Sequence, residues 1–125
     1  MKTILIVDDS SAVRQQVSMT LKPVGFVMVE AADGLEGLAA VDSNRKIDLV
    51  ICDINMPNMN GLEMLEKIKS KAENKSLPVL MLTTEGHVAL VKRAKEAGAL
   101  GWIVKPFKRS QLVQTVCHLT GESFA

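Results

Sequence analysis

Residues 4–11 read ILIVDDSS, and this stretch sets a pattern that the rest of the chain repeats. Its four apolar residues, three of them β-branched, have the length and type expected of a strand buried on both faces of a parallel sheet. The two aspartates and two serines that follow end the strand, and Ser10 or Ser11 can cap a helix that begins there. The stretch therefore predicts a buried β-strand followed directly by an α-helix.

The same order of apolar run and helical stretch recurs four more times. The further strands are expected at residues 26–31, 49–52, 79–82 and 101–104. The first helix is expected to end near Pro23 and Gly25, and the second to begin after a cap at Asp33. The third is expected to begin near Gly61, the fourth to run from Val88 to Ala97, and the fifth from Arg109 to Leu119. Five such repeats predict an α/β fold, a doubly wound five-stranded parallel sheet with helices on both faces.

Length and composition limit what the chain can be. Its 125 residues fit one domain, 47% of them are hydrophobic, and we find no internal linker, repeat or room for an output module. The 15 basic and 14 acidic residues nearly balance, which argues against a nucleic-acid partner. The first apolar run is too short for a secretion signal or a membrane span, and Cys52 and Cys117 form no zinc or redox motif. We therefore expect a soluble, cytoplasmic domain with no membrane partner.

Polar side chains follow four of the five expected strands. The first strand runs into Asp8 and Asp9, the third into Asp53, the fourth into Thr83 and the fifth into Lys105. Because ligands of open parallel sheets bind beyond the carboxyl ends of the strands, we expect these groups on one rim. Two carboxylates 4 Å apart repel by about 4 kcal/mol at an effective dielectric constant of 20, so three of them require a cation.

This set of groups suits Mg2+ and phosphoryl chemistry. Mg2+ prefers oxygen ligands, and a carboxylate near it can attack phosphorus. A lysine ammonium can neutralise the phosphoryl oxygens, and a threonine hydroxyl can donate a further hydrogen bond. Each residue alone also has a structural interpretation, because aspartates cap helices and end turns, Thr83 can simply end a strand, and Lys105-Pro106 can be only a turn. Their coincidence on one rim favours the chemical interpretation.

Four segments resemble the signature segments of response regulator receivers, and they lie at residues 4–10, 53–61, 83–85 and 105–107. The resemblance identifies residues 1–125 as a receiver domain with a flavodoxin-like fold and the strand order 2-1-3-4-5. It implies that Asp53 is the phospho-acceptor. It also implies a cis peptide bond before Pro106, which proline permits at low cost.

The resemblance also implies the other roles at the site. Asp8 and Asp9 match the acidic pair that holds Mg2+ together with Asp53, Asp9 directly and Asp8 through water. Asn55 matches the residue whose backbone carbonyl completes the metal shell. Thr83 and Lys105 match the residues that engage the phosphoryl oxygens.

Three further positions match variable or switching residues of such receivers. Trp102 occupies the position of a rotating aromatic switch, more usually Tyr or Phe, and a static core tryptophan is the alternative. Asn55 and Glu85 match the positions that set the lifetime of the phosphoryl group, and they imply rapid self-dephosphorylation. Thr84 stands where the family usually has a smaller residue, so its bulk is expected to narrow the access of phosphodonors.

The resemblance is to the CheY-like, single-domain chemotaxis branch of the family. It implies a monomeric signalling switch that catalyses only its own phosphorylation and dephosphorylation. A CheA-like histidine kinase would be the donor, a flagellar motor switch protein a target, and a phosphatase a further partner. One alternative is a phosphorelay intermediate. A second is an aspartyl-phosphate hydrolase of the haloacid dehalogenase type, which is disfavoured because Ser10 stands where that family has its catalytic acid. A third is a flavodoxin, which is disfavoured because Asp8 and Asp9 would repel the anionic FMN phosphate.

Overall fold

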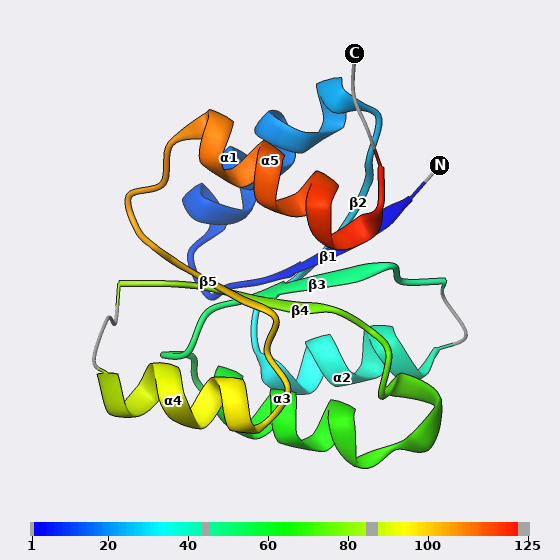
Figure 1. The fold of residues 1–125 in the computed structure, drawn as a ribbon, viewed down its shortest axis with the longest axis vertical. Helices are drawn as coiled ribbons and strands as arrows, with labels where there is room; N and C mark the ends of the chain where they lie inside the picture. The colour runs from blue at the N-terminus through cyan, green and yellow to red at the C-terminus, as the bar shows by residue number, and fades with distance from the viewer. Residues whose placement is uncertain (1, 44–45, 85–87, 123–125) are drawn as a thin grey trace.

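A five-stranded parallel sheet with helices on both faces forms the centre of the computed structural model, which describes residues 2–43, 46–84 and 88–122 (Figure 1). The strands are β1 (Thr3–Val7), β2 (Val27–Ala31), β3 (Leu49–Cys52), β4 (Val79–Thr83) and β5 (Gly101–Val104). They pair in the order β2-β1-β3-β4-β5. The predicted fold class and the strand order implied by the resemblance are therefore confirmed.

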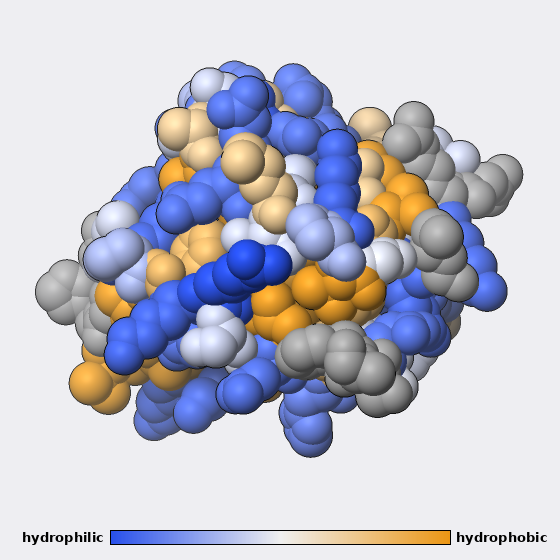
Figure 2. Space-filling view, turned by 90° about the horizontal axis from the view of Figure 1, so that it is seen from above, coloured by the Kyte–Doolittle hydropathy of each residue, from blue (hydrophilic) through white to orange (hydrophobic). Residues whose placement is uncertain are grey.

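The helices lie in two layers. The α-helices are α1 (Ser11–Leu21), α2 (Gly34–Asp42), α3 (Gly61–Ser70), α4 (Val88–Glu96) and α5 (Arg109–Thr120), with short 3-10 turns η1 (Lys22–Val24) and η2 (Ala72–Asn74). Figure 1 shows α1 and α5 above the sheet and α2, α3 and α4 below it. The face over α1 and α5 is largely hydrophilic, with hydrophobic patches between the polar side chains (Figure 2).

Side-chain caps fix where three of the helices begin. Ser10 accepts a hydrogen bond from the backbone N–H of Val13 at 3.3 Å, so Ser10 rather than Ser11 caps α1. Asp33 caps α2, as predicted, and Asn60 caps α3 in a capping box with Glu63. These caps place the start of each helix immediately after the loop that leaves the sheet.

Element ends differ from the expectations by one or two residues. Phe26 is not part of β2, because its N–H bonds to the carbonyl oxygen of Leu21 at the end of α1. Strand β4 includes Thr83, one residue more than expected. Helix α1 ends at Leu21, and Pro23 lies in the following 3-10 turn, which closes at Gly25 with a φ of 111°.

Two hydrophobic clusters fill the space between the sheet and its helices. One packs α2, α3 and α4 against the sheet, and the other packs α1 and α5 against the opposite face. All four residues of β3 are completely buried, as expected for a central strand covered on both sides. Among the described residues, none of the helices combines the length and the apolar character that crossing a membrane requires.

Candidate functional site

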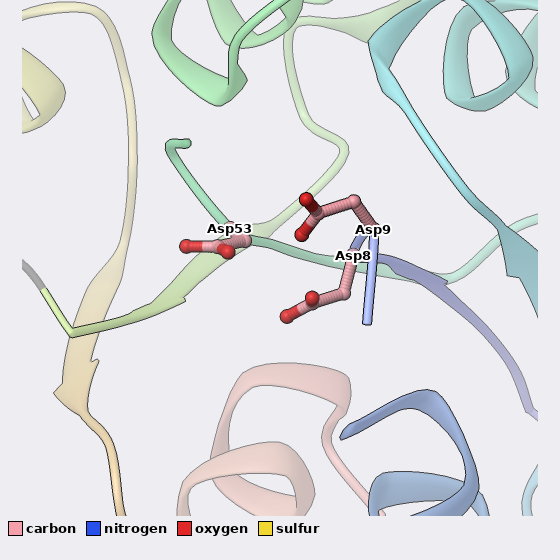
Figure 3. A group of neighbouring side chains, drawn as sticks. All are labelled: Asp8, Asp9 and Asp53. Carbon is pink, nitrogen blue, oxygen red and sulfur yellow. The ribbon is translucent and has the colours of Figure 1, made fainter. Parts of the chain in front are cut away.

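Strand pairing brings three aspartates together at the carboxyl ends of β1 and β3. Val7 lies opposite Cys52 in the parallel ladder, so the residues that follow each strand leave the sheet side by side. The N–H of Asp53 then bonds to the carbonyl oxygen of Val7 at 3.0 Å. Carboxylate oxygens of Asp8, Asp9 and Asp53 lie within 4.8 Å of one another, and Figure 3 shows the three side chains gathered at this end of the two strands.

The three carboxylates differ in exposure. Asp8 is 1% exposed and Asp53 is 7% exposed, whereas Asp9 is exposed to solvent. Backbone N–H groups support the two buried carboxylates. The N–H of Ser10 donates to Oδ1 of Asp8 at 2.9 Å, and the N–H of Ile54 donates to Oδ1 of Asp53 at 2.7 Å. Backbone hydrogen bonds therefore fix the positions of the carboxylates of Asp8 and Asp53, whereas the carboxylate of Asp9 is exposed to water.

Lys105 supplies the positive charge beside the buried carboxylates. Its Nζ lies 2.8 Å from Oδ2 of Asp8 and 3.4 Å from Oδ2 of Asp53. Burial alone would lower the pKa of Lys105, but the hydrogen bond to Asp8 and the charges of Asp53 and Asp8 outweigh it, and the pKa is raised above 10.5. The ammonium group therefore remains charged at neutral pH. The peptide bond between Lys105 and Pro106 is cis, as the resemblance implies.

Cys52 lies directly under the site and takes no part in nucleophilic chemistry. Burial raises the pKa of its thiol strongly, and the charges of Asp53 and Asp8 raise it further. The thiol is completely buried and donates to the carbonyl oxygen of Asp53 at 3.1 Å. Because only the thiolate is a good nucleophile, Cys52 acts as a packing residue, which agrees with the lack of a zinc or redox motif around it in the sequence.

Three of the remaining predicted site residues lie at the end of β4 or in the loops that follow β4 and β3. Thr83 is fully buried at the end of β4, and its carbonyl oxygen accepts the N–H of Lys105 at 2.8 Å. Thr84 and Asn55 are exposed in the loops that follow β4 and β3. Glu85 lies outside the described residues.

Trp102 lies within β5, opposite Met81 in the ladder with β4. Its side chain is partly buried and packs against the cluster under α2, α3 and α4. This position fits both a static core residue and a ring that moves, so the two interpretations of Trp102 stay predictions.

Two residues that support the site were not recognised in the sequence as part of it. A Cβ atom on Gly61 would lie 2.0 Å from the carbonyl oxygen of Asp53, so only glycine fits this close approach. Arg14 donates from Nη1 to the carbonyl oxygen of Asp8 at 2.6 Å and from Nε to Glu30 at 3.1 Å. The sequence shows Gly61 as the start of a helix and as the last residue of the segment 53–61 that resembles receivers, but not as a close approach to Asp53, and no local pattern points to Arg14.

Together these groups form a small cluster of charged side chains at one edge of the sheet. Three clustered carboxylates are the donor set that a hard divalent cation such as Mg2+ requires, so the residues present fit that ion. The fixed ammonium of Lys105 adds positive charge where an anionic group would sit beside Asp53. The arrangement suits transfer of a phosphoryl group to a carboxylate.

Comparison with known proteins points in the same direction. Residues 4–117 match the family model described as the response regulator receiver domain. The chemotaxis protein CheY1 of Helicobacter pylori is 42% identical over 105 residues, 83% of this chain and 85% of that protein. The chain also resembles a crystallised chemotaxis protein CheY4 of Vibrio cholerae, with a TM-score of 0.89 and 41% identity over 95% of this chain and 98% of that one. CheY in the CheX-CheY-BeF3-Mg2+ complex of Borrelia burgdorferi has a TM-score of 0.87 and 34% identity over 94% of this chain and 88% of that one.

Proposed function

The chain belongs to the response regulator receiver family, and on that premise we propose that it is a Mg2+-dependent chemotaxis switch whose phospho-acceptor is Asp53. The observation that carries this proposal is the convergence of Asp8, Asp9 and Asp53 within 4.8 Å, with Lys105 paired to two of them. A structural turn would not require three carboxylates and an ammonium from three separate segments. A phosphoryl-accepting site does require them.

The transfer step uses Asp53 as the nucleophile. A carboxylate oxygen of Asp53 forms a bond to phosphorus while the bond between phosphorus and the imidazole nitrogen of a phosphohistidine donor breaks. The imidazole nitrogen keeps the electron pair. Hydrolysis reverses the attachment, because water attacks phosphorus and the Asp53 carboxylate leaves with its electron pair. The N–H of Ile54, at 2.7 Å from Oδ1, orients the carboxylate for both steps.

The metal-binding roles are distributed over four residues. Asp9 and Asp53 would hold Mg2+ directly, Asp8 through water, and Asn55 through its backbone carbonyl. When bound, Mg2+ supplies positive charge that offsets the repulsion among the carboxylates and the phosphoryl oxygens. The exposure of Asp9 to solvent is consistent with its assignment as a direct ligand of an ion that enters from water.

Lys105 and Thr83 complete the site around the transferred group. The ammonium of Lys105 is held by Asp8 at 2.8 Å, so it is already oriented before the phosphoryl group arrives. It then pairs with a phosphoryl oxygen, and the Thr83 hydroxyl donates to another. Thr83 is buried at the end of β4, which pairs with β5. Trp102 lies in β5, the strand that leads to Lys105. Movement of Thr83 toward the phosphoryl group would therefore change the packing around Trp102.

The output face is the surface of α4, β5 and α5. Three large apolar side chains are exposed on or next to it, Val88 by 83%, Leu100 by 61% and Val104 by 48%. The basic residues Lys92 and Lys95 of α4 are also exposed. A CheA-like histidine kinase would donate the phosphoryl group, and a flagellar motor switch protein is the proposed target. The CheX complex of the Borrelia relative supports an additional regulatory partner, for which we propose a phosphatase.

Three further positions would tune the reaction, and two of them, Asn55 and Thr84, are exposed. Asn55 and Glu85 are proposed to give a short phosphoryl lifetime, and Thr84, exposed beside Thr83, to restrict phosphodonor access. Phosphorylated protein that persists for many hours in Mg2+ would contradict the first assignment.

Mass spectrometry after treatment with acetyl phosphate and Mg2+ tests the proposal. One added phosphoryl group is expected on the wild-type protein and none on Asp53→Asn. Phosphorylation that survives this substitution would refute Asp53 as the acceptor. Efficient transfer from the phosphorylated protein to an isolated histidine phosphotransfer domain, without binding to a motor switch peptide, would instead favour a phosphorelay intermediate.

A further inference from the structure

The loop that follows the phospho-acceptor is tied to the start of α2. This loop, residues 54–60, connects β3 to α3 and contains Asn55. Nδ2 of Asn58 donates to Oδ2 of Asp33 at 2.7 Å. The other carboxylate oxygen of Asp33 accepts the N–H of Glu36 at 2.9 Å and caps α2. One buried carboxylate therefore serves the helix and the loop at the same time.

Asn58 is suited to this contact by its backbone. Its φ of 68° lies in the left-handed region, which asparagine tolerates better than most residues. The next residue packs directly on α2, because a Cβ on Gly34 would lie 2.7 Å from the carbonyl oxygen of Met59. The loop thus contacts α2 without a gap at the point where Asn58 reaches Asp33.

The near end of the loop is held independently. The N–H of Ile54 bonds to Asp53, and its carbonyl oxygen accepts the N–H of Gly61 at 2.9 Å. Only residues 55–57 separate this fixed point from Asn58. The backbone of Asn55 therefore lies in a short segment whose one end is fixed beside Asp53 and whose other end is fixed against α2.

From this geometry we propose that Asp33 and Asn58 are positioning residues for the metal, which fix the loop so that the Asn55 carbonyl is presented beside Asp53. The inference rests on the proposed function. Neither side chain touches the three clustered carboxylates in the described contacts. Their effect on Mg2+ would pass through the loop backbone, and the loss of a supporting contact of this kind typically weakens metal binding by about 10-fold or more.

Two substitutions remove the bond while leaving local structure intact. Asn58→Gly keeps the left-handed backbone and removes the amide. Asp33→Ser keeps a good cap for α2, but its single short hydroxyl cannot also reach Asn58. Glu36→Ala is the matched control, because it removes the hydrogen bond that the N–H of Ala32 donates to Oε1 of Glu36 at the same helix end and leaves the bond between Asn58 and Asp33 in place.

Isothermal titration of Mg2+ into the unphosphorylated proteins gives the first readout, and the Mg2+ dependence of acetyl phosphate labelling gives the second. Each single variant is expected to raise the Mg2+ dissociation constant about 10-fold, with a labelling rate at saturating Mg2+ close to wild type. The double variant is expected to be no worse than either single one, because both remove one bond. Glu36→Ala is expected to bind Mg2+ as the wild type does.

The outcomes separate this inference from the proposed function. Wild-type protein that does not bind Mg2+ would overturn the proposed function and the inference with it. Wild-type protein that binds Mg2+, with Asn58→Gly and Asp33→Ser binding equally well, would overturn only the inference. The inference would also be overturned if the double variant multiplied the two single increases in the Mg2+ dissociation constant, or if Glu36→Ala raised that constant as much as the single variants. A general loosening of α2 would then explain the result.

Discussion

Replacing Gly61 with alanine would place a methyl group where the protein has no room. The added Cβ would lie 2.0 Å from the carbonyl oxygen of Asp53 and 3.0 Å from Sγ of Cys52. Real Cβ atoms essentially never approach another heavy atom closer than 3.0 Å, so the Asp53 backbone and α3 must separate by at least 3.0 − 2.0 = 1.0 Å. The obstructing atom belongs to the backbone and cannot rotate away.

This displacement has two consequences of different size. Alanine is the better helix former by about 0.8–1.0 kcal/mol, whereas overpacking costs about 1–3 kcal/mol, so we expect a net loss of about 0–2 kcal/mol in the free energy of unfolding. A shift of about 1 Å at a reacting group can reduce its rate about 100-fold. A 100-fold loss of rate corresponds to about 2.7 kcal/mol of activation free energy, so the effect on the phosphorylation rate is expected to be larger than the effect on stability.

Urea unfolding and the initial rate of labelling by acetyl phosphate at saturating Mg2+ measure the two effects. Lys67→Ala, on the exposed side of the same helix, is the control and is expected to change neither. If Gly61→Ala instead stabilises the protein by about 1 kcal/mol, as a glycine-to-alanine change in an unobstructed helix would, and labels at the wild-type rate, the close approach is not a constraint and the reasoning is refuted.

Three other predictions concern the charged groups. Lys105→Met is expected to lower the urea midpoint at pH 8, and the difference from wild type should narrow as pH rises above 10.5. The pKa of Lys105 is raised in the folded state, so the stability that its charge contributes is full below 10.5 and is lost as pH rises through the raised pKa. A difference that does not narrow at any pH above 10.5 would contradict this. Asp9→Ala is expected to weaken Mg2+ binding in calorimetry without reducing metal-free stability, since removing one carboxylate relieves repulsion with Asp8 and Asp53. The pKa of Asp33 is lowered by the N–H of Glu36 and by Asn58, so its contribution is present above 3.8 and is lost as pH falls through the lowered value; the difference in urea midpoint between wild type and Asp33→Ala should accordingly be larger at pH 7 than at pH 3.

The sheet could be predicted from the sequence because its strands are signalled locally. Each strand is a short, mainly apolar run, and four of the five are followed by polar residues at their carboxyl ends. Parallel pairing then forces those ends onto one edge, so the closeness of Asp8 and Asp53 follows from strand order alone. The caps at Ser10 and Asp33 were predictable for the same reason, since the helix that each serves begins within the next residues.

The supporting contacts were not predictable, because they join segments that no local pattern relates. Arg14 reaches both the Asp8 carbonyl and Glu30, sixteen residues away. Asn58 reaches Asp33 across twenty-five residues. The tight packing at Gly61 depends on the angle at which α3 leaves its loop, and a glycine at a helix start does not report that angle. The strand order also required the family resemblance, because alternation of strands and helices alone permits several orders.

The ion pair between Lys105 and Asp8 joins residues that are 97 positions apart in the chain. Such a contact forms only after the first and last strands have joined the same sheet, and closing a loop of that length carries an entropic cost that local structure does not repay. A nascent or partly folded chain can hold Asp53 at the end of β3 and still lack the ammonium beside it. Under the proposed function, the protein can therefore be phosphorylated on Asp53 only at the end of folding. A chain stalled during synthesis before Lys105 would not accept a phosphoryl group from its kinase.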